Sequence, residues 1–200
     1  MKILLLYTPR CGSTSILNYF CKVNNNNYKC YNEPWFEWMI QKEYNNIRIN
    51  YDELITEQNI FVKCTYKTIP VSIDQAILDF DKVVFLLRRN IKDQVESSII
   101  AHSDGSFLDR SKKIYNIFNL TDDDYSINIE RLNFLNKTLN DFAIKYNKPL
   151  FYYEDLYYGD FTPLFEELEI SYNSIYFKEF LNNSNRYRIK IEQKKISTLI

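Results

Sequence analysis

A short stretch near the start of the chain has the composition of a loop that binds phosphate. It contains Arg10, Cys11, Gly12, Ser13, Thr14 and Ser15, and it directly follows the apolar run 3–7. Gly12 lets the backbone approach a ligand closely. The amides after it open a predicted helix, and a helix N-terminus attracts anions through its unpaired N–H groups. Arg10 adds a full positive charge, although a plain strand-to-helix turn has a similar sequence.

An arginine and a serine further along the chain have a spacing that suits a second phosphate. Arg89 follows the strand candidate 82–87, the most hydrophobic of the chain, and Ser97 comes eight residues later inside a predicted helix. A guanidinium offers phosphate a charge-assisted hydrogen bond, and a hydroxyl offers a neutral one. Together with Arg10, the pair predicts a ligand that carries two separated phosphate groups.

These residues follow predicted strands in an alternating pattern of strands and helices. Apolar runs predict strands at 2–8, 28–31, 60–66, 82–87 and 150–153. Apolar residues at helical spacing predict helices at 15–22, 35–44, 71–80, 91–102, 123–146, 161–168 and 174–181. Asn90 is placed to cap the helix 91–102, with Asp93 at its third position. The alternation predicts a three-layer α/β fold, in which helices flank a central, mostly parallel sheet. Ligands bind such sheets beyond the carboxyl ends of the strands.

The composition predicts one globular domain, residues 1–200. The 25 Lys and Arg against 26 Asp and Glu give a net charge of −1, which argues against nucleic-acid or membrane partners. The run 3–7 is too short for a membrane span or a secretion signal. We therefore expect a cytoplasmic protein whose four cysteines are reduced thiols. No Cys and His spacing suits a metal, and the oligomeric state stays open.

The loop at 9–15 and the Arg89–Ser97 pair resemble the sulfotransferase family that uses 3′-phosphoadenosine-5′-phosphosulfate (PAPS). Members carry such a loop for the 5′-phosphosulfate after the first strand, and an arginine with a serine eight residues later for the 3′-phosphate. The segment 151–156 is similar to the family's Tyr-Glu-Asp-Leu segment, whose tyrosine, here Tyr153, lies near the adenine. The resemblance spans roughly residues 2–170 and implies the family's fold, a variant of the P-loop NTPase-like α/β fold.

The chain also departs from this family at two places. Cytosolic members often carry a catalytic histidine after the third strand, whereas 63–70 contains none. The C-terminal element that grips the 3′-phosphate is represented only by Arg186 and Arg188. Glu33, after the second strand, resembles the Glu-Pro segment of carbohydrate-type sulfotransferases, which implies a replacement general base. The alternative is a carboxylate stabilised by the dipole of the helix that follows.

The resemblance implies transfer of a sulfuryl group from PAPS to a hydroxyl or amine of a small-molecule or carbohydrate acceptor. The product of the donor is adenosine 3′,5′-bisphosphate (PAP), and no metal is implied. Arg10 and the loop amides would hold the leaving phosphate, Glu33 would take the acceptor proton, and Lys63 or Lys67 would assist. One alternative is a P-loop kinase-like phosphotransferase, against which the missing Walker A lysine argues. The other is a nucleotide-binding module that kept the fold and lost catalysis.

Overall fold

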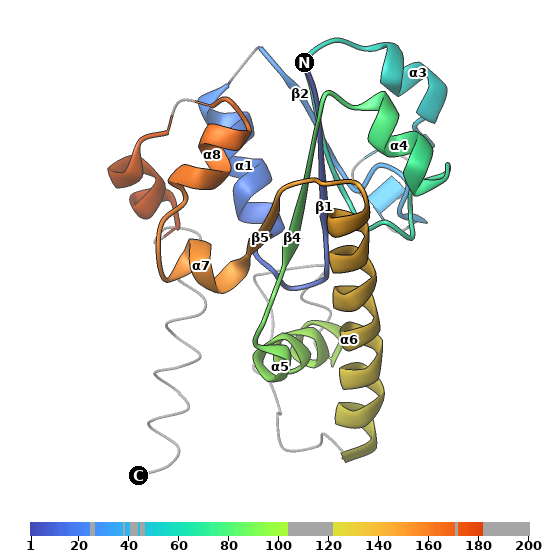
Figure 1. Ribbon diagram of the computed structural model, residues 1–200, viewed down its shortest axis with the longest axis vertical. Coiled ribbons are helices and arrows are strands. Elements are labelled where there is room, and N and C mark those ends of the chain that lie inside the picture. Colours follow the sequence, from blue (N-terminus) through green and yellow to red (C-terminus); the bar gives the residue numbers. More distant parts are fainter. Residues whose placement is uncertain are drawn as a thin grey trace.

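The computed structural model describes residues 1–24, 27–37, 39–40, 44, 47–103, 122–170 and 172–181. Its centre is a five-stranded sheet in the order β2-β3-β1-β4-β5 (Figure 1). The strands are β1 (Lys2–Tyr7), β2 (Lys29–Asn32), β3 (Ile60–Cys64), β4 (Lys82–Leu87) and β5 (Leu150–Tyr152). Every neighbouring pair is parallel, so the prediction of an α/β fold with a mostly parallel sheet is confirmed.

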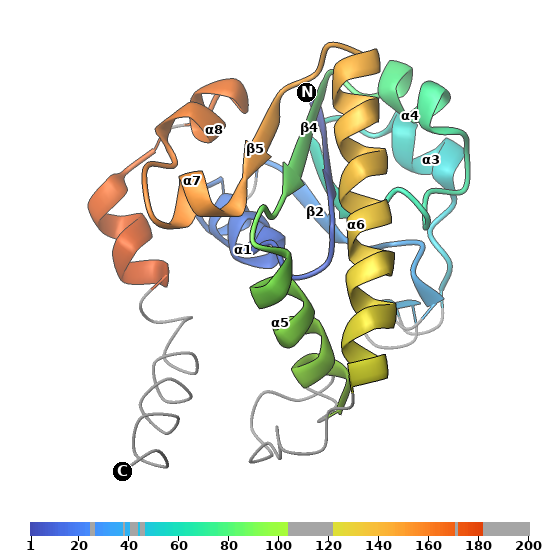
Figure 2. The same cartoon turned by 60° about the horizontal axis from the view of Figure 1, so that its bottom comes forward.

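Helices cover both faces of this sheet and make the three layers. They are α1 (Ser13–Val23), α3 (Tyr51–Thr56), α4 (Ile73–Asp79), α5 (Ile91–Ser103), α6 (Asp122–Lys145), α7 (Tyr153–Tyr157) and α8 (Thr162–Glu167), and residues 174–181 are also helical. Helices α1, α7 and α8 lie on one face, while α3, α4 and α6 lie on the other (Figure 1). Helix α5 lies beyond the carboxyl end of β4 and packs beside α6 (Figure 2).

Side-chain alternation along β1 explains why two cores form. Ile3, Leu5 and Tyr7 pack in the cluster with α1, α7 and α8, whereas Leu4 and Leu6 pack in the cluster with α3, α4 and α6. Successive side chains of a strand point to opposite faces of the sheet. Both sets are buried, which explains why residues 3–7 are all apolar in β1, the central strand of the sheet.

Some helix and strand boundaries agree with the sequence prediction, and others differ from it. Asp93 N–H donates to the Asn90 side chain at 3.1 Å, which confirms the predicted cap of α5. Asn50 caps α3, a helix that the sequence did not predict. The strand predicted at 150–153 ends at Tyr152, because α7 begins at Tyr153. In the predicted helix 35–44, residues 37, 39 and 40 are helical, and Trp35 lies in the turn before them.

None of the helices in the described ranges combines the length and the apolar character that a membrane span requires.

Candidate functional site

The loop between β1 and α1 has the backbone of an anion-binding turn. Arg10 and Gly12 both adopt left-handed conformations, with φ values of 67° and 80°. Gly12 is the N-cap of α1, and its carbonyl accepts a hydrogen bond from Ser15 N–H at 3.1 Å. Left-handed residues at a helix start can gather N–H groups into a concave surface that holds phosphate. Cys11 and Ser13 are buried, while Thr14 and Ser15 are partly exposed.

The structure brings this loop into contact with the second predicted phosphate element. Arg10 Nε donates to Ser97 Oγ at 2.9 Å. Arg10 is exposed and Ser97 is partly exposed on α5. Two residues that are 87 positions apart in the chain thus line the same edge of the sheet, beyond the carboxyl ends of β1 and β4.

Arg89 has a different set of partners from the one that the sequence suggested. Its guanidinium forms a two-pronged ion pair with Asp155, in which NH2 lies 2.7 Å from Oδ2, and it stacks 3.8 Å from the ring centre of Tyr152. Hydrogen bonding from Arg89 lowers the pKa of Asp155. Ser97 therefore contacts Arg10 rather than Arg89, and two nitrogens of the Arg89 guanidinium are held by Asp155.

The neighbouring arginine, Arg88, turns to the opposite face and is buried. Its NH1 donates to the carbonyl of Arg10 at 3.2 Å, and its guanidinium carbon lies 4.5 Å from the ring centre of Tyr153. Tyr153 is itself buried and stacks on Tyr157 with ring centres 4.3 Å apart. Tyr153 thus lies behind the loop, among aromatic and guanidinium groups that could support a nucleotide.

A carboxylate and an ammonium group, largely shielded from solvent, form an ion pair at the carboxyl ends of β2 and β3. Lys63 Nζ lies 3.1 Å from Glu33 Oε1, with side-chain exposures of 2% and 18%. Lys63 also donates to Asn32 Oδ1 at 2.9 Å. Tyr7, the last residue of β1, donates its hydroxyl to the same Glu33 oxygen. Burial, with the nearby Glu33 as a second cause, raises the pKa of Tyr7 well above its usual value, so Tyr7 stays a donor.

The second carboxylate oxygen of Glu33 remains available for chemistry. Both the Tyr7 and the Lys63 contacts use Oε1, and within the described residues no side chain or backbone group donates to Oε2. Glu33 also has a left-handed backbone, with φ 51°, and its N–H donates to the carbonyl of Lys63 at 2.7 Å. The backbone of Glu33 is therefore tied to the carboxyl end of β3, and its carbonyl accepts from Phe36 N–H at 3.0 Å in the turn that follows.

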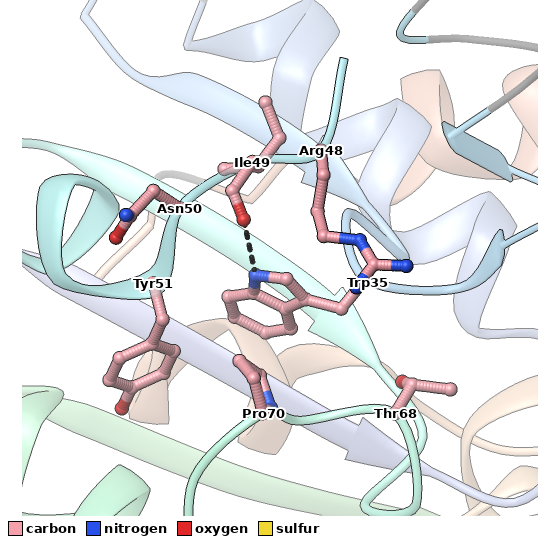
Figure 3. Close-up of a pocket in the computed structure, with 7 residues that line it drawn as sticks. All are labelled: Trp35, Arg48, Ile49, Asn50, Tyr51, Thr68 and Pro70. Atoms are coloured by element: carbon pink, nitrogen blue, oxygen red, sulfur yellow. Dashed lines mark hydrogen bonds between the residues drawn. The ribbon is translucent and has the colours of Figure 1, made fainter. Parts of the chain in front are cut away.

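A pocket opens next to Trp35, between the segment 48–51 and the residues Thr68 and Pro70 (Figure 3). The indole N–H donates to the Ile49 carbonyl at 3.1 Å, which fixes the ring. Pro70 lies below the ring, and Arg48 and Thr68 lie at one side (Figure 3). The pocket has a volume of about 380 Å³. Its lining comes from the segments that follow β2 and β3 in the chain and from the start of α3.

Two of the four cysteines correct a prediction. Cys21, near the end of α1, and Cys30, in β2, form a disulfide with Cα atoms 6.2 Å apart, so the expectation of four reduced thiols is wrong for this pair. Cys11 and Cys64 are free and buried. Burial raises the pKa of Cys11 to about 12 and also raises that of Cys64.

Several predicted residues fall outside what the structure describes. Arg186 and Arg188 lie beyond the described residues, as do Trp38 and the side chain of His102. Within the described ranges, no group of three or more His, Cys, Asp or Glu side chains is arranged to hold a metal ion.

Comparison with known proteins supports the fold. No family model matches the chain, and no curated protein matches it. Among solved structures, it is similar to mouse sulfotransferase SULT7A1 complexed with PAP, with a TM-score of 0.55 and 14% sequence identity. The likeness covers 89% of this chain and 62% of that one, so the chain spans less than two thirds of its neighbour. The chain has a sulfotransferase fold.

Sequence reasoning missed four residues that the structure places at the site. Tyr7 contacts Glu33, and Arg88, Gln94 and Asn136 form a buried polar network behind the loop. A weak signal existed for Gln94, because a polar residue one turn after the Asn90 cap interrupts the apolar face of α5. No local pattern indicated Asn136, whose contacts are all long-range.

Proposed function

We propose that this protein transfers a sulfuryl group from PAPS to a hydroxyl group of a small-molecule or carbohydrate acceptor. The observation that carries this proposal is the joint placement of two elements on a sulfotransferase fold. One is the β1–α1 loop with its Arg10–Ser97 contact, and the other is the buried Glu33–Lys63 pair at the adjoining strand ends.

The donor side has groups of the correct chemistry for a phosphosulfate. The start of α1 offers backbone N–H groups, and Arg10 offers a cation at the mouth of the loop. When bound, PAPS supplies the sulfuryl group and leaves as PAP. Arg10 and the loop amides then face the oxygen where negative charge grows, and preorganised donors at such a position give the largest catalytic effect. The candidates for binding the 3′-phosphate are Arg89 and Ser97, and Tyr153 is the candidate for contact with the adenine. In the C-terminal segment, the candidates for a further contact to the 3′-phosphate are Arg186 and Arg188.

The acceptor side has a base and a cation held together. Glu33 Oε2 would take the acceptor proton while the acceptor oxygen forms its bond to sulfur and the bond from sulfur to the phosphate oxygen breaks. A positioned base contributes about 10²–10⁴-fold to the rate. Lys63 and Tyr7 hold Oε1, so Oε2 keeps a fixed direction. The pocket beside Trp35 gives an aromatic face against which an acceptor ring could pack.

Titration calorimetry of the purified protein tests the proposal. Binding of PAP in preference to ATP, together with sulfate transfer from PAPS to a panel of phenols, alcohols and sugars, supports a sulfotransferase. Binding of ATP with phosphoryl transfer would instead support the kinase-like alternative, which the missing Walker A lysine disfavours. PAP binding without turnover on the whole panel would support a nucleotide-binding module, because the fold alone does not determine chemistry.

A further inference from the structure

Three carbonyl groups of the β1–α1 loop accept hydrogen bonds from side chains of other elements. The Pro9 carbonyl accepts from Gln94 Nε2 at 2.6 Å, the Arg10 carbonyl from Arg88 NH1 at 3.2 Å, and the Gly12 carbonyl from the Tyr157 hydroxyl at 2.8 Å. A carbonyl oxygen that pointed at phosphate would repel it. An anion-binding loop must therefore direct its carbonyls into the protein and its amides outward.

Gln94 is the centre of this arrangement. It is fully buried on α5, and its Nε2 donates both to Thr8 Oγ1 at 3.1 Å and to the Pro9 carbonyl. Its Oε1 accepts from Asn136 Nδ2 at 3.0 Å. Both amide hydrogens of Gln94 thus bond to the segment that enters the loop, and its amide oxygen accepts from α6.

Asn136 determines which way the Gln94 amide points. Its Nδ2 also donates to the Arg88 carbonyl at 3.1 Å, so it can present only a donor to Gln94. If the Gln94 amide were flipped, its N–H groups would face the N–H groups of Asn136, and its oxygen would face the Pro9 carbonyl oxygen. Two buried mismatches of this kind are costly, so a single orientation is selected.

We propose that Gln94 is a positioning residue of the nucleotide site, oriented by Asn136. It holds Thr8 and Pro9 in the conformation in which the amides after Gly12 face a phosphate group. The inference rests on the proposed function for the identity of the ligand, while the conformation of the loop can be measured without any ligand.

The first test is Gln94→Glu, which keeps the size of the side chain and removes the donor. At pH 8 the buried carboxylate has no hydrogen for the Pro9 carbonyl, and we expect the dissociation constant of PAP to rise about tenfold to hundredfold. At pH 5.5 a protonated carboxyl can donate again, because burial favours its neutral form. The ratio of variant to wild-type affinity should therefore recover at the lower pH. The charged groups next to the network, Arg88 with its partners Asp93 and Glu154, are the same in both proteins.

The second test leaves the loop contacts untouched. Asn136→Leu removes the group that orients Gln94, and it also removes Asn136 Oδ1, which is buried and accepts no hydrogen bond from the described residues. We expect PAP affinity to fall about threefold to tenfold, together with a measurable loss of stability, because Gln94 Oε1 and the Arg88 carbonyl both lose their donor. Asp141→Leu, which is exposed on the same helix and does not line the cavity beside Arg89 and Asn136, is the control and should bind PAP like the wild type.

Hydrogen exchange separates this inference from the proposed function. Exchange of the segment 9–15 should be faster in Gln94→Glu and Asn136→Leu than in the wild type, without nucleotide. If the wild type does not bind PAP, the proposed function fails, and faster exchange in the variants still supports the inference. Unchanged exchange, or a PAP affinity ratio near one at both pH values, would make Gln94 an ordinary core residue and overturn the inference.

Discussion

Lys63 and Glu33 form an ion pair, 3.1 Å between Nζ and Oε1, at the carboxyl ends of two adjacent strands. In the β2–β3 register, Asn32 lies opposite Lys63, so Glu33 is the first residue beyond the paired strand. The pair is nearly enclosed, and the attraction between its charges is therefore stronger than at the surface. A side chain on a loop far from the sheet would lack this fixed geometry.

The first prediction concerns Glu33 as the general base. Glu33→Gln should preserve folding and PAP affinity, because the change is nearly isosteric, and should lower kcat by about 10²–10⁴-fold. Initial-rate assays with PAPS and any hydroxyl compound that the enzyme accepts measure kcat. Glu37→Gln, on the same segment but exposed, is the control and should leave turnover intact. Turnover of Glu33→Gln within about threefold of wild type would exclude a base role.

Arg10 should act mainly in the transition state, whereas Ser97 should act mainly in binding. Arg10→Ala should lower kcat more than it weakens PAP binding, because charge on the leaving phosphate grows during transfer. Ser97→Ala removes a neutral donor and should have the smaller effect. Steady-state kinetics and calorimetry on the two variants, with the exposed Lys92→Ala as control, give both quantities. Equal losses of kcat and affinity in Arg10→Ala would make it a binding residue alone.

Asp155 should compete with phosphate for Arg89. If Arg89 binds the 3′-phosphate, Arg89→Ala should weaken PAP binding by about 1.5–3 kcal/mol. Asp155→Asn should tighten binding several-fold, because it releases both guanidinium nitrogens that the carboxylate now holds. Calorimetry with PAP measures both. Weaker binding in Asp155→Asn, or no change in Arg89→Ala, would show that the ion pair serves only the fold.

Gly12 should tolerate no side chain. An added Cβ would lie 2.5 Å from Tyr157 Cζ, and the φ of 80° is unfavourable for any L-residue. Gly12→Ala should therefore abolish PAP binding and reduce the free energy of unfolding, by about 1–2 kcal/mol for the backbone alone and more for the clash. In a Tyr157→Ala background the clash disappears and only the backbone cost should remain. Urea denaturation of the four proteins measures the two contributions, and equal costs in both backgrounds would contradict the clash.

Two buried thiols should weaken the fold at alkaline pH. Burial raises the pKa of Cys11 from 9.0 to about 12 and shifts Cys64 in the same direction. A raised pKa gives stability that is fully present below pH 9 and is lost as the pH rises toward the folded-state pKa. At pH 10 the loss should be about 1.4 kcal/mol for each thiol. Urea denaturation at pH 8 and pH 10 tests this, and Cys11→Ala with Cys64→Ala should have a smaller difference between the two pH values.

The sequence by itself determined the order of strands and helices and the candidate loop. The continuous apolar run 83–87 matched β4, because a strand buried on both faces is apolar at nearly every position. The glycine and the arginine before α1 were equally visible, since a helix N-terminus after a strand is a local feature. Asn90 predicted the start of α5, because a helix cap is also a local feature.

Only the tertiary structure decided which side chains meet. Arg10 contacts Ser97, and Arg89 contacts Asp155, although spacing had grouped Arg89 with Ser97. Arg88 and Arg89 follow the last residue of β4, and Arg88 turns inward to the Arg10 carbonyl while Arg89 turns to Asp155. The Cys21–Cys30 disulfide and the Gln94–Asn136 contact likewise join elements that are brought together by the order β2-β3-β1-β4-β5 and by the packing of α6. Long-range contacts of this kind leave no periodic signal in the sequence.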